Sequence, residues 1–186
     1  VTQIPPSILR SHGIPVCRLV QEPGDFVITW PAAFHGGFNS GLNCAEAVNF
    51  ATDDWFQHGR DAEIEYRTQR RPLVFSHDQV DRSNHPDTST LVDQFEESSR
   101  IECLDRDLLL EEGITQLQVV AEKVSFDDVQ PCFQCQHPCF FSWVVCKEHD
   151  DVIMCVDDLC DCPAEDKTVH ERFSPSRLKA MCRALK

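Results

Sequence analysis

The chain has 186 residues, of which 41% are hydrophobic, so it can bury a core. Its formal net charge of −14, with only 17 Lys and Arg residues, argues against direct binding to nucleic acid, which needs clustered positive charge. A basic partner, such as a cationic protein tail, suits this charge better, although acidity can serve solubility alone. The sequence has no apolar run of about 18 residues and no signal-peptide pattern, so we expect a soluble, intracellular protein with no membrane partner.

Two short runs near the beginning of the chain predict a β-hairpin. Residues 16–20 and 25–30 are rich in β-branched and aromatic side chains, and Pro23 and Gly24 between them suit a turn. Before this hairpin, residues 7–10 can form one turn of helix. The chain begins without methionine, and we expect it to be a fragment of a longer protein.

A glycine-rich turn around His35 follows the second run. Gly36 and Gly37 let the backbone bend directly after His35, so that Asn39 can reach back toward whatever His35 binds. Residues 43–50 then predict another strand. The turn therefore indicates a presented ligand, and the alternative is a tight turn in which His35 is hydrogen-bonded to a neighbour.

The middle and end of the chain predict helices. Asp53 or Asp54 can cap a helix around Trp55, and residues 60–69 continue in a helical pattern. Residues 81–90 are polar and suit a linker. Apolar residues at helical intervals over 91–123 predict two or three amphipathic helices, broken near Gly113. Ser174 and the proline after it predict the start of a final helix.

The residues from Pro23 to Phe50 resemble the C-terminal half of the Jumonji C (JmjC) domain of histone lysine demethylases, most closely the subgroup acting on histone H3 at lysine four. Pairs such as Asp54–Trp55 and Tyr66–Arg67, and the run at 75–78, are similar to the continuation of that subgroup. The resemblance covers roughly residues 8–80 and resumes at residue 130.

The resemblance implies an Fe(II)- and 2-oxoglutarate-dependent oxygenase on a double-stranded β-helix, which removes methyl groups from lysine as formaldehyde. In that family His35 corresponds to the distal histidine ligand of the iron. Asn39 and Phe38 correspond to residues of the cosubstrate pocket. The resemblance also implies a nuclear protein that binds the histone H3 tail and joins chromatin complexes.

One departure from the family concerns the other iron ligands. The family has a His-X-Glu or His-X-Asp pair upstream of the distal histidine, whereas only His12 precedes His35 in this chain. We therefore expect this chain alone to be inactive and to need the remaining N-terminal half of the catalytic domain as its partner. The alternative is a catalytically inactive, zinc-binding chromatin scaffold or interaction module.

Seven of the eleven cysteines fall within a stretch of 31 residues, with the short spacings typical of zinc ligands. They are Cys132, Cys135, Cys139, Cys146, Cys155, Cys160 and Cys162. Disulfides are not expected in an intracellular chain. Aromatic residues such as Phe141 and Trp143 are expected to form the small core beneath the metals rather than an interaction surface.

This segment resembles the zinc finger with five cysteines, one histidine and two cysteines that follows the JmjC domain in the same subgroup. Glu148 replaces one family cysteine, and a shortened interval before Cys160 removes the family histidine. For one or two structural zinc ions, the expected ligands are Cys132, Cys135 and Cys155 with Cys139 or Asp158 at one site, and Cys146, Cys160 and Cys162 with His149 at the other.

These observations predict an α+β chain in four parts. Residues 1–80 are expected to be the C-terminal part of the catalytic JmjC domain, and residues 81–130 a helical linker or domain. Residues 131–165 are expected to be the zinc finger, and residues 166–186 the C-terminal helix.

Overall fold

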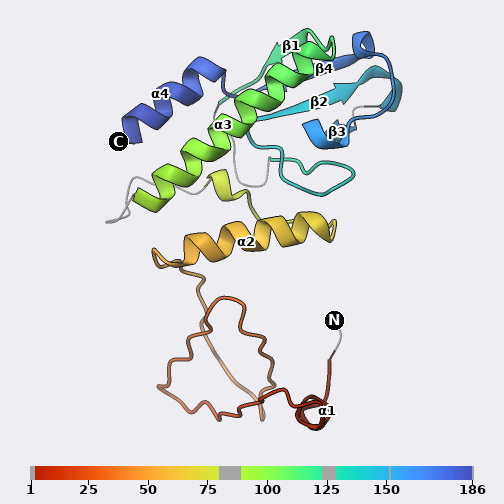
Figure 1. The fold of residues 1–186 in the computed structure, drawn as a ribbon. Coiled ribbons are helices and arrows are strands. Elements are labelled where there is room, and N and C mark those ends of the chain that lie inside the picture. Colours follow the sequence, from red (N-terminus) through yellow and green to blue (C-terminus); the bar gives the residue numbers. More distant parts are fainter. Residues whose placement is uncertain (1–2, 80–88, 123–128, 151, 186) are drawn as a thin grey trace. The chain divides into compact units, whose positions relative to one another are not determined.

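A computed structural model describes residues 3–79, 89–122, 129–150 and 152–185 of the chain. The chain divides into two compact units, Val1–Cys44 and Ala45–Lys186 (Figure 1). Both helices and strands occur, so the expected α+β class is confirmed. Among the described residues, no helix is long and apolar enough to cross a membrane.

The first unit contains one helix, α1, which spans Pro6–Ser11 and confirms the helical turn expected there. The expected turn also forms, with the Asp25 N–H donating to the Glu22 carbonyl at 3.0 Å and Gly24 at φ +95°. The strands predicted over 16–20, 25–30 and 43–50 do not form among the described residues.

The missing strands have a physical cause, because most of their described side chains are exposed rather than packed in a core. Phe26 is 96% exposed, and Phe38 on the following turn is 93% exposed. An isolated hairpin is marginally stable at best, since a strand needs further strands for its backbone and a core for its apolar face. The apolar side chains of these runs were predicted correctly from the sequence, but among the described residues no other element covers them.

The second unit contains a four-stranded sheet with the order β1-β4-β2-β3. Its strands are β1 (Gln116–Val119), β2 (Ser142–Cys146), β3 (Ile153–Met154) and β4 (Lys167–Glu171). Strand β4 pairs in parallel with β1 and antiparallel with β2, which also pairs antiparallel with β3.

The two faces of this sheet are covered differently. Val144 of β2 and Val169 of β4 pack with Leu109 of helix α3 (Ser89–Glu111) in one buried cluster. Successive side chains of a strand point to opposite faces, and Trp143 packs against the cysteines at 132–139 instead. Helix α3 therefore lies on one face of β2, and the first group of cysteines lies on the other.

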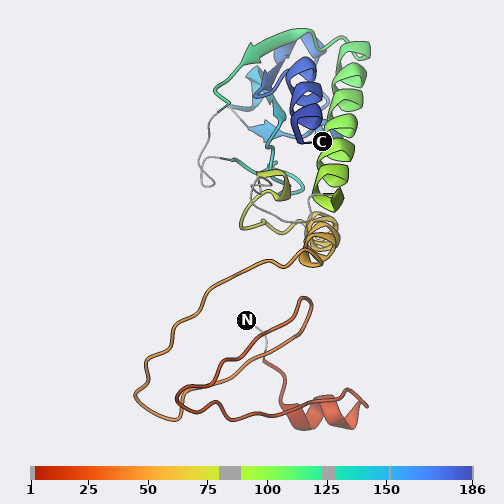
Figure 2. The ribbon, with the colours of Figure 1, turned by 90° about the vertical axis from the view of Figure 1, so that its left-hand side faces the viewer.

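Helix α4 (Pro175–Leu185) packs beside α3 (Figure 2). Leu178 and Cys182 of α4 form a second buried cluster with Phe95 of α3, Phe141 and Phe173. The hydroxyl of Ser174 accepts a hydrogen bond from the Arg177 N–H at 3.2 Å, so Ser174 caps the helix as expected.

Helix α3 is one continuous helix, whereas two or three helices were predicted over 91–123. Buried polar residues interrupt its apolar face: Ser99 is 4% exposed and Arg106 is 7% exposed. The Arg106 guanidinium donates to Glu102 of α3 and to Glu171 of β4, each at 2.7 Å. Because part of the buried face of α3 is polar, apolar residues do not recur along it without interruption. The sequence therefore suggested more than one helix where the structure has one.

The predicted break at Gly113 is confirmed. Helix α3 ends in a Schellman arrangement: the Ile114 N–H donates to the Leu109 carbonyl at 2.9 Å, and the Gly113 N–H donates to the Leu110 carbonyl at 3.0 Å. Gly113 has φ +84°, and Leu109 and Ile114 pack together in the core. The chain then enters strand β1, where a helix had been expected.

Helix α2 spans Trp55–Thr68 and joins the two helical segments predicted at its ends into one. Asp54 occupies the N-cap position, although its side chain makes no capping hydrogen bond. Most of the linker predicted over 81–90 lies outside the described residues, and α3 begins at Ser89.

Candidate metal centres

The His35 turn lies at the surface of the first unit. The His35 Nδ1 lies 2.9 Å from the Ala33 carbonyl, and the Asn39 side-chain oxygen accepts from the Asn43 amide at 2.9 Å. A metal-binding histidine commonly donates its other ring N–H to a backbone carbonyl. His35 is therefore oriented so that its Nε2 is the nitrogen able to bind a metal.

The turn does not make a complete iron site. Among the described residues, no group of three or more candidate ligands includes His35. A facial triad needs two histidines and one carboxylate. The residues present thus supply one donor, and no catalytic step can be derived from this chain alone.

The first metal centre combines Cys132, Cys135, Cys155 and Asp158, whose ligand atoms all lie within 4.8 Å of one another. Cys132 and Cys135 lie on a tight turn, in which the Gln136 N–H donates to the Cys132 carbonyl at 3.0 Å. The Asp158 N–H donates to the Cys155 carbonyl at 3.2 Å, which turns the carboxylate toward the thiols. Two local turns thus supply two ligands each.

The second metal centre combines Cys146, His149, Cys160 and Cys162, within the same 4.8 Å limit. Cys146 is the last residue of β2, and His149 ends the short 3-10 helix Lys147–His149 that follows it. The His149 Nε2 lies 3.3 Å from the Cys162 sulfur. Again, each half of the centre comes from one short segment.

The two centres are interleaved along the chain. The ligand pairs occur in the order Cys132/Cys135, Cys146/His149, Cys155/Asp158 and Cys160/Cys162. The first and third pairs form one centre, and the second and fourth pairs form the other. Each loop closed by one metal therefore contains ligands of the other.

Both donor sets fit zinc. Tetrahedral zinc with sulfur ligands at about 2.3 Å places neighbouring sulfurs about 3.8 Å apart. The Cys135 and Cys155 sulfurs are 3.6 Å apart, close to this value and far beyond a disulfide bond of about 2.05 Å. Cysteine, histidine and carboxylate are also the protein ligands that zinc accepts.

The thiols of the first centre are coupled to one another before a metal binds. A hydrogen bond with Cys155 lowers the pKa of Cys132, and the same hydrogen bond, together with burial, raises the pKa of Cys155. Burial also raises the pKa of Cys139. Zinc binds cysteine as the thiolate, so a metal bound here would replace the protons of these thiols.

Cys139 is not one of the grouped ligands, although the sequence offered it as an alternative to Asp158. Its side chain is 5% exposed and packs with Cys132 and Cys135, and its sulfur donates to the His137 carbonyl at 3.7 Å. Among the described residues, the Asp158 carboxylate completes the first group instead. This geometry gives Cys139 the surroundings of a core thiol.

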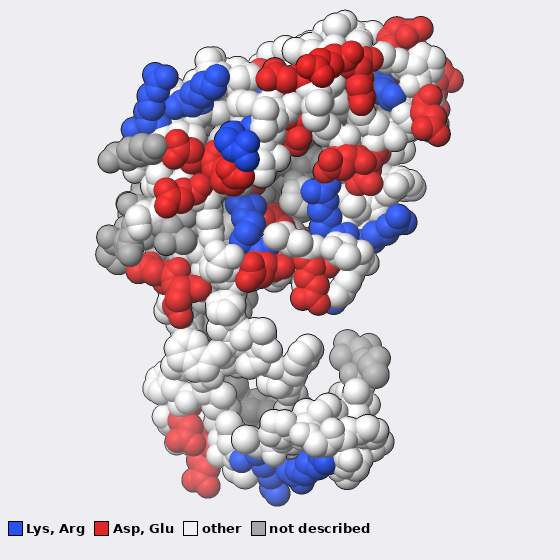
Figure 3. Space-filling view, viewed as in Figure 1, with Lys and Arg blue, Asp and Glu red and all other residues white. Residues whose placement is uncertain are grey.

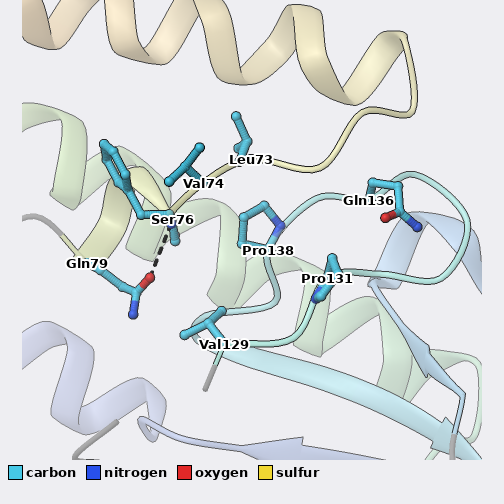
Figure 4. Close-up of a pocket in the computed structure, with 9 residues that line it drawn as sticks. Leu73, Val74, Ser76, Gln79, Val129, Pro131, Gln136 and Pro138 are labelled. Atoms are coloured by element: carbon cyan, nitrogen blue, oxygen red, sulfur yellow. Dashed lines mark hydrogen bonds between the residues drawn. The ribbon is translucent and has the colours of Figure 1, made fainter. Parts of the chain in front are cut away.

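A small cavity lies beside the first centre, between residues 73–79 and 129–138 (Figure 4). Pro131 and Pro138 form one wall, and Val74 and Ser76 lie opposite. Its volume of about 40 Å³ holds a few water molecules, since each water needs at least about 10–15 Å³ measured in this way. The cavity is too small for a cosubstrate.

Acidic and basic side chains are interspersed on the face shown in Figure 3. A group of basic side chains lies at the lower end of this face, and acidic side chains lie next to basic ones over much of the rest.

Comparison with known proteins gives matches at both ends of the chain. Residues 1–50 match the family described as JmjC domain, hydroxylase, and residues 132–181 match the C5HC2 zinc finger. One end of the chain is thus similar to part of a JmjC domain, and the other end is similar to a C5HC2 zinc finger. The resemblance expected from the sequence is thereby confirmed.

Three curated relatives align with this chain along all or nearly all of its length. The chain is 37% identical over 201 residues to lysine-specific demethylase 5D of Homo sapiens and 38% identical over 197 residues to lysine-specific demethylase 5B of Gallus gallus, each alignment covering 100% of this chain. It is 34% identical over 196 residues to lysine-specific demethylase JMJ17 of Arabidopsis thaliana, with 97% of this chain covered. The chain spans 13% of the length of the first two and 16% of the third.

The sequence did not identify Arg67 as part of the metal region. Its Nη2 lies 3.8 Å from the Cys155 sulfur, and it pairs with Asp157. Arg67 and Cys155 are 88 residues apart, so no local spacing could have indicated this contact.

Proposed function

We propose that this chain is part of an Fe(II)- and 2-oxoglutarate-dependent histone lysine demethylase that acts on methylated lysine of the histone H3 tail, with lysine four as the expected position. One observation carries this proposal: the chain aligns from end to end with lysine-specific demethylases, with its JmjC and C5HC2 segments in one chain. We further propose that the complete protein works in the nucleus, within chromatin complexes.

In this proposal His35 is one iron ligand, and Asn39 and Phe38 line the cosubstrate pocket. The remaining ligands come from the N-terminal half of the catalytic domain, outside this chain. Bound iron and 2-oxoglutarate would supply the oxidation of the N-methyl group. The exposed apolar side chains around the turn, such as Phe34 and Leu42, support this division because they are suited to burial against further strands.

The test uses the complete protein and an H3 peptide methylated at lysine four. We expect formaldehyde release that depends on 2-oxoglutarate, and we expect His35→Ala to abolish it. His12→Ala is the control, because His12 is the C-cap residue of α1 and its Nδ1 lies 2.9 Å from the Ile8 carbonyl of that helix. Full activity of the His35→Ala protein would contradict the proposal.

A second candidate function is a catalytically inactive, zinc-binding scaffold or interaction module. It is favoured by the single iron donor in the described part of the chain. The same assay decides between them: a complete protein that binds H3 peptide but never consumes 2-oxoglutarate is a scaffold.

We also propose that the two centres hold one zinc ion each and that these ions are structural. All four positions of each centre have a protein ligand, so neither leaves an open position for chemistry. The expected domain boundaries at residues 80, 130 and 165 remain part of this proposal.

A further inference from the structure

Each proposed zinc centre has a positively charged side chain next to it that is not a ligand. At the first centre this side chain is Arg67, near the end of α2. Its Nη2 contacts the sulfur of the ligand Cys155 at 3.8 Å and pairs with the carboxylate of Asp157. Arg67 therefore links a helix outside the finger to a metal ligand.

The ion pair alone gives Arg67 little structural value. The Arg67 and Asp157 side chains are 36% and 63% exposed, and pairs this exposed contribute about 0–1 kcal/mol to stability. The contact with a ligand sulfur is different, because a donor to a zinc-bound thiolate changes how strongly that thiolate binds the metal.

At the second centre the side chain is Lys167, the first residue of β4. It is only 6% exposed, and its Nζ donates to the carbonyl of the ligand Cys162 at 2.7 Å. Within the described ranges, Lys167 forms no ion pair with a carboxylate. A buried ammonium is costly unless negative charge lies near it. The thiolates of the second centre can supply that charge.

The formal charges of the two centres favour an adjacent cation. A zinc ion with three thiolates and one carboxylate has a formal charge of −2, and one with three thiolates and a neutral histidine has −1. Both centres lie in a chain that is already strongly acidic. An adjacent cation would lower the cost of collecting these anionic ligands.

We propose that Arg67 and Lys167 are positioning residues, each serving one metal centre: Arg67 stabilises the thiolate of Cys155, and Lys167 stabilises the loop that carries Cys160 and Cys162. This inference rests on the zinc sites proposed above. Arg67 also makes the packing of α2 depend on the first centre, so that metal binding in the finger is communicated to the helix that follows the JmjC segment.

The experiment titrates the purified 186-residue chain with Co²⁺, whose thiolate charge-transfer absorption reports binding, in a Cys160→Ser background to follow the first centre and in a Cys132→Ser background to follow the second. We expect Arg67→Gln to weaken the first centre by about 10–100-fold, the usual effect of losing an outer-sphere partner. The second centre should change much less. Lys167→Gln should show the reverse pattern.

Two matched variants provide the controls. Arg100→Gln removes an exposed arginine that pairs with Glu97 within α3, and it should leave both centres unchanged. Arg67→Lys keeps the charge and should recover part of the affinity of the first centre. Hydrogen exchange of α2 should speed up after metal removal in the parent chain, and to a smaller extent in Arg67→Gln, where the link is already broken.

The outcomes separate the two levels of the proposal. If the parent chain binds no Co²⁺ at thiolate centres, the zinc sites themselves are refuted. If it binds two ions but Arg67→Gln weakens neither centre, or weakens both equally, the role of Arg67 is refuted. Arg67 is partly exposed, so this variant should fold even if Lys167→Gln does not.

Discussion

At the scale of single residues, the fourth ligand of the first centre is the point where the sequence left two alternatives. Cys139 and Asp158 are both close to Cys132, but only the Asp158 carboxylate reaches the other ligand atoms among the described residues. The spacing of residues in the sequence cannot show which of the two is the ligand. That depends on how the turn at 155–158 places the Asp158 carboxylate relative to the thiols.

We predict that Asp158→Asn weakens the first centre and that Cys139→Ser does not. An amide is a poorer zinc ligand than a carboxylate because it carries no charge. Zinc analysis of the purified chains after dialysis should give fewer ions per chain for Asp158→Asn and an unchanged ratio for Cys139→Ser. The reverse result would assign Cys139 as the ligand.

Arg106 is a second residue whose role the sequence did not reveal. It joins α3 to β4 through buried bonds to Glu102 and Glu171, and it also donates to the Phe173 carbonyl at 2.7 Å. Removing one partner of such a network leaves buried charge without compensation.

We therefore predict that Arg106→Met lowers the free energy of unfolding by about 3–5 kcal/mol. Arg100→Met is the matched control on the same helix, since its pair with Glu97 is exposed and contributes about 0–1 kcal/mol. Urea unfolding of the zinc-loaded chains measures both. Equal losses would show that the buried network contributes no more than a surface pair.

At the scale of elements, local signals were sufficient where neighbouring residues determine the structure. Helix α4 follows from its Ser174 cap and its apolar spacing, and the end of α3 follows from Gly113. Strand β1 was missed because all four of its residues are exposed and its partner β4 lies about fifty positions later in the chain. Pairing over that separation leaves no local pattern.

Separation along the chain also limits how much of the candidate site can be predicted from the sequence. The short spacings predicted the ligand pairs, and the structure brings together the sets expected from them. The sequence pattern could not show whether the strands predicted in the first unit form. A hairpin is stable only when further strands or a packed face support it.

The end of α3 gives a prediction at this scale. Gly113→Ala should destabilise the second unit by about 1 kcal/mol, because a Cβ is disfavoured at φ +84°. Space is not the cause: an added Cβ would meet the Ala164 Cβ at 3.7 Å, an ordinary contact. Gly113→Asn should lose less, since Asn tolerates this conformation. Thermal unfolding of the two variants compares them directly, and a larger loss for Asn would contradict the conformational explanation.

At the scale of the whole molecule, the two units differ in how much buried apolar core each contains. Val1–Cys44 exposes most of its apolar side chains, whereas Ala45–Lys186 has two apolar clusters and the metal centres. The first unit therefore has little core of its own, whereas the second forms a core by itself.

The alternation of ligand pairs has a consequence for the integrity of the chain. A single backbone cut between His149 and Cys155 would leave half of each donor set on either fragment. Each ion would then bind ligands from both fragments and hold the fragments together. We predict that the fragments co-elute in size-exclusion chromatography until a chelator removes the ions. Fragments that separate while zinc is still bound would show that the donor sets are not interleaved.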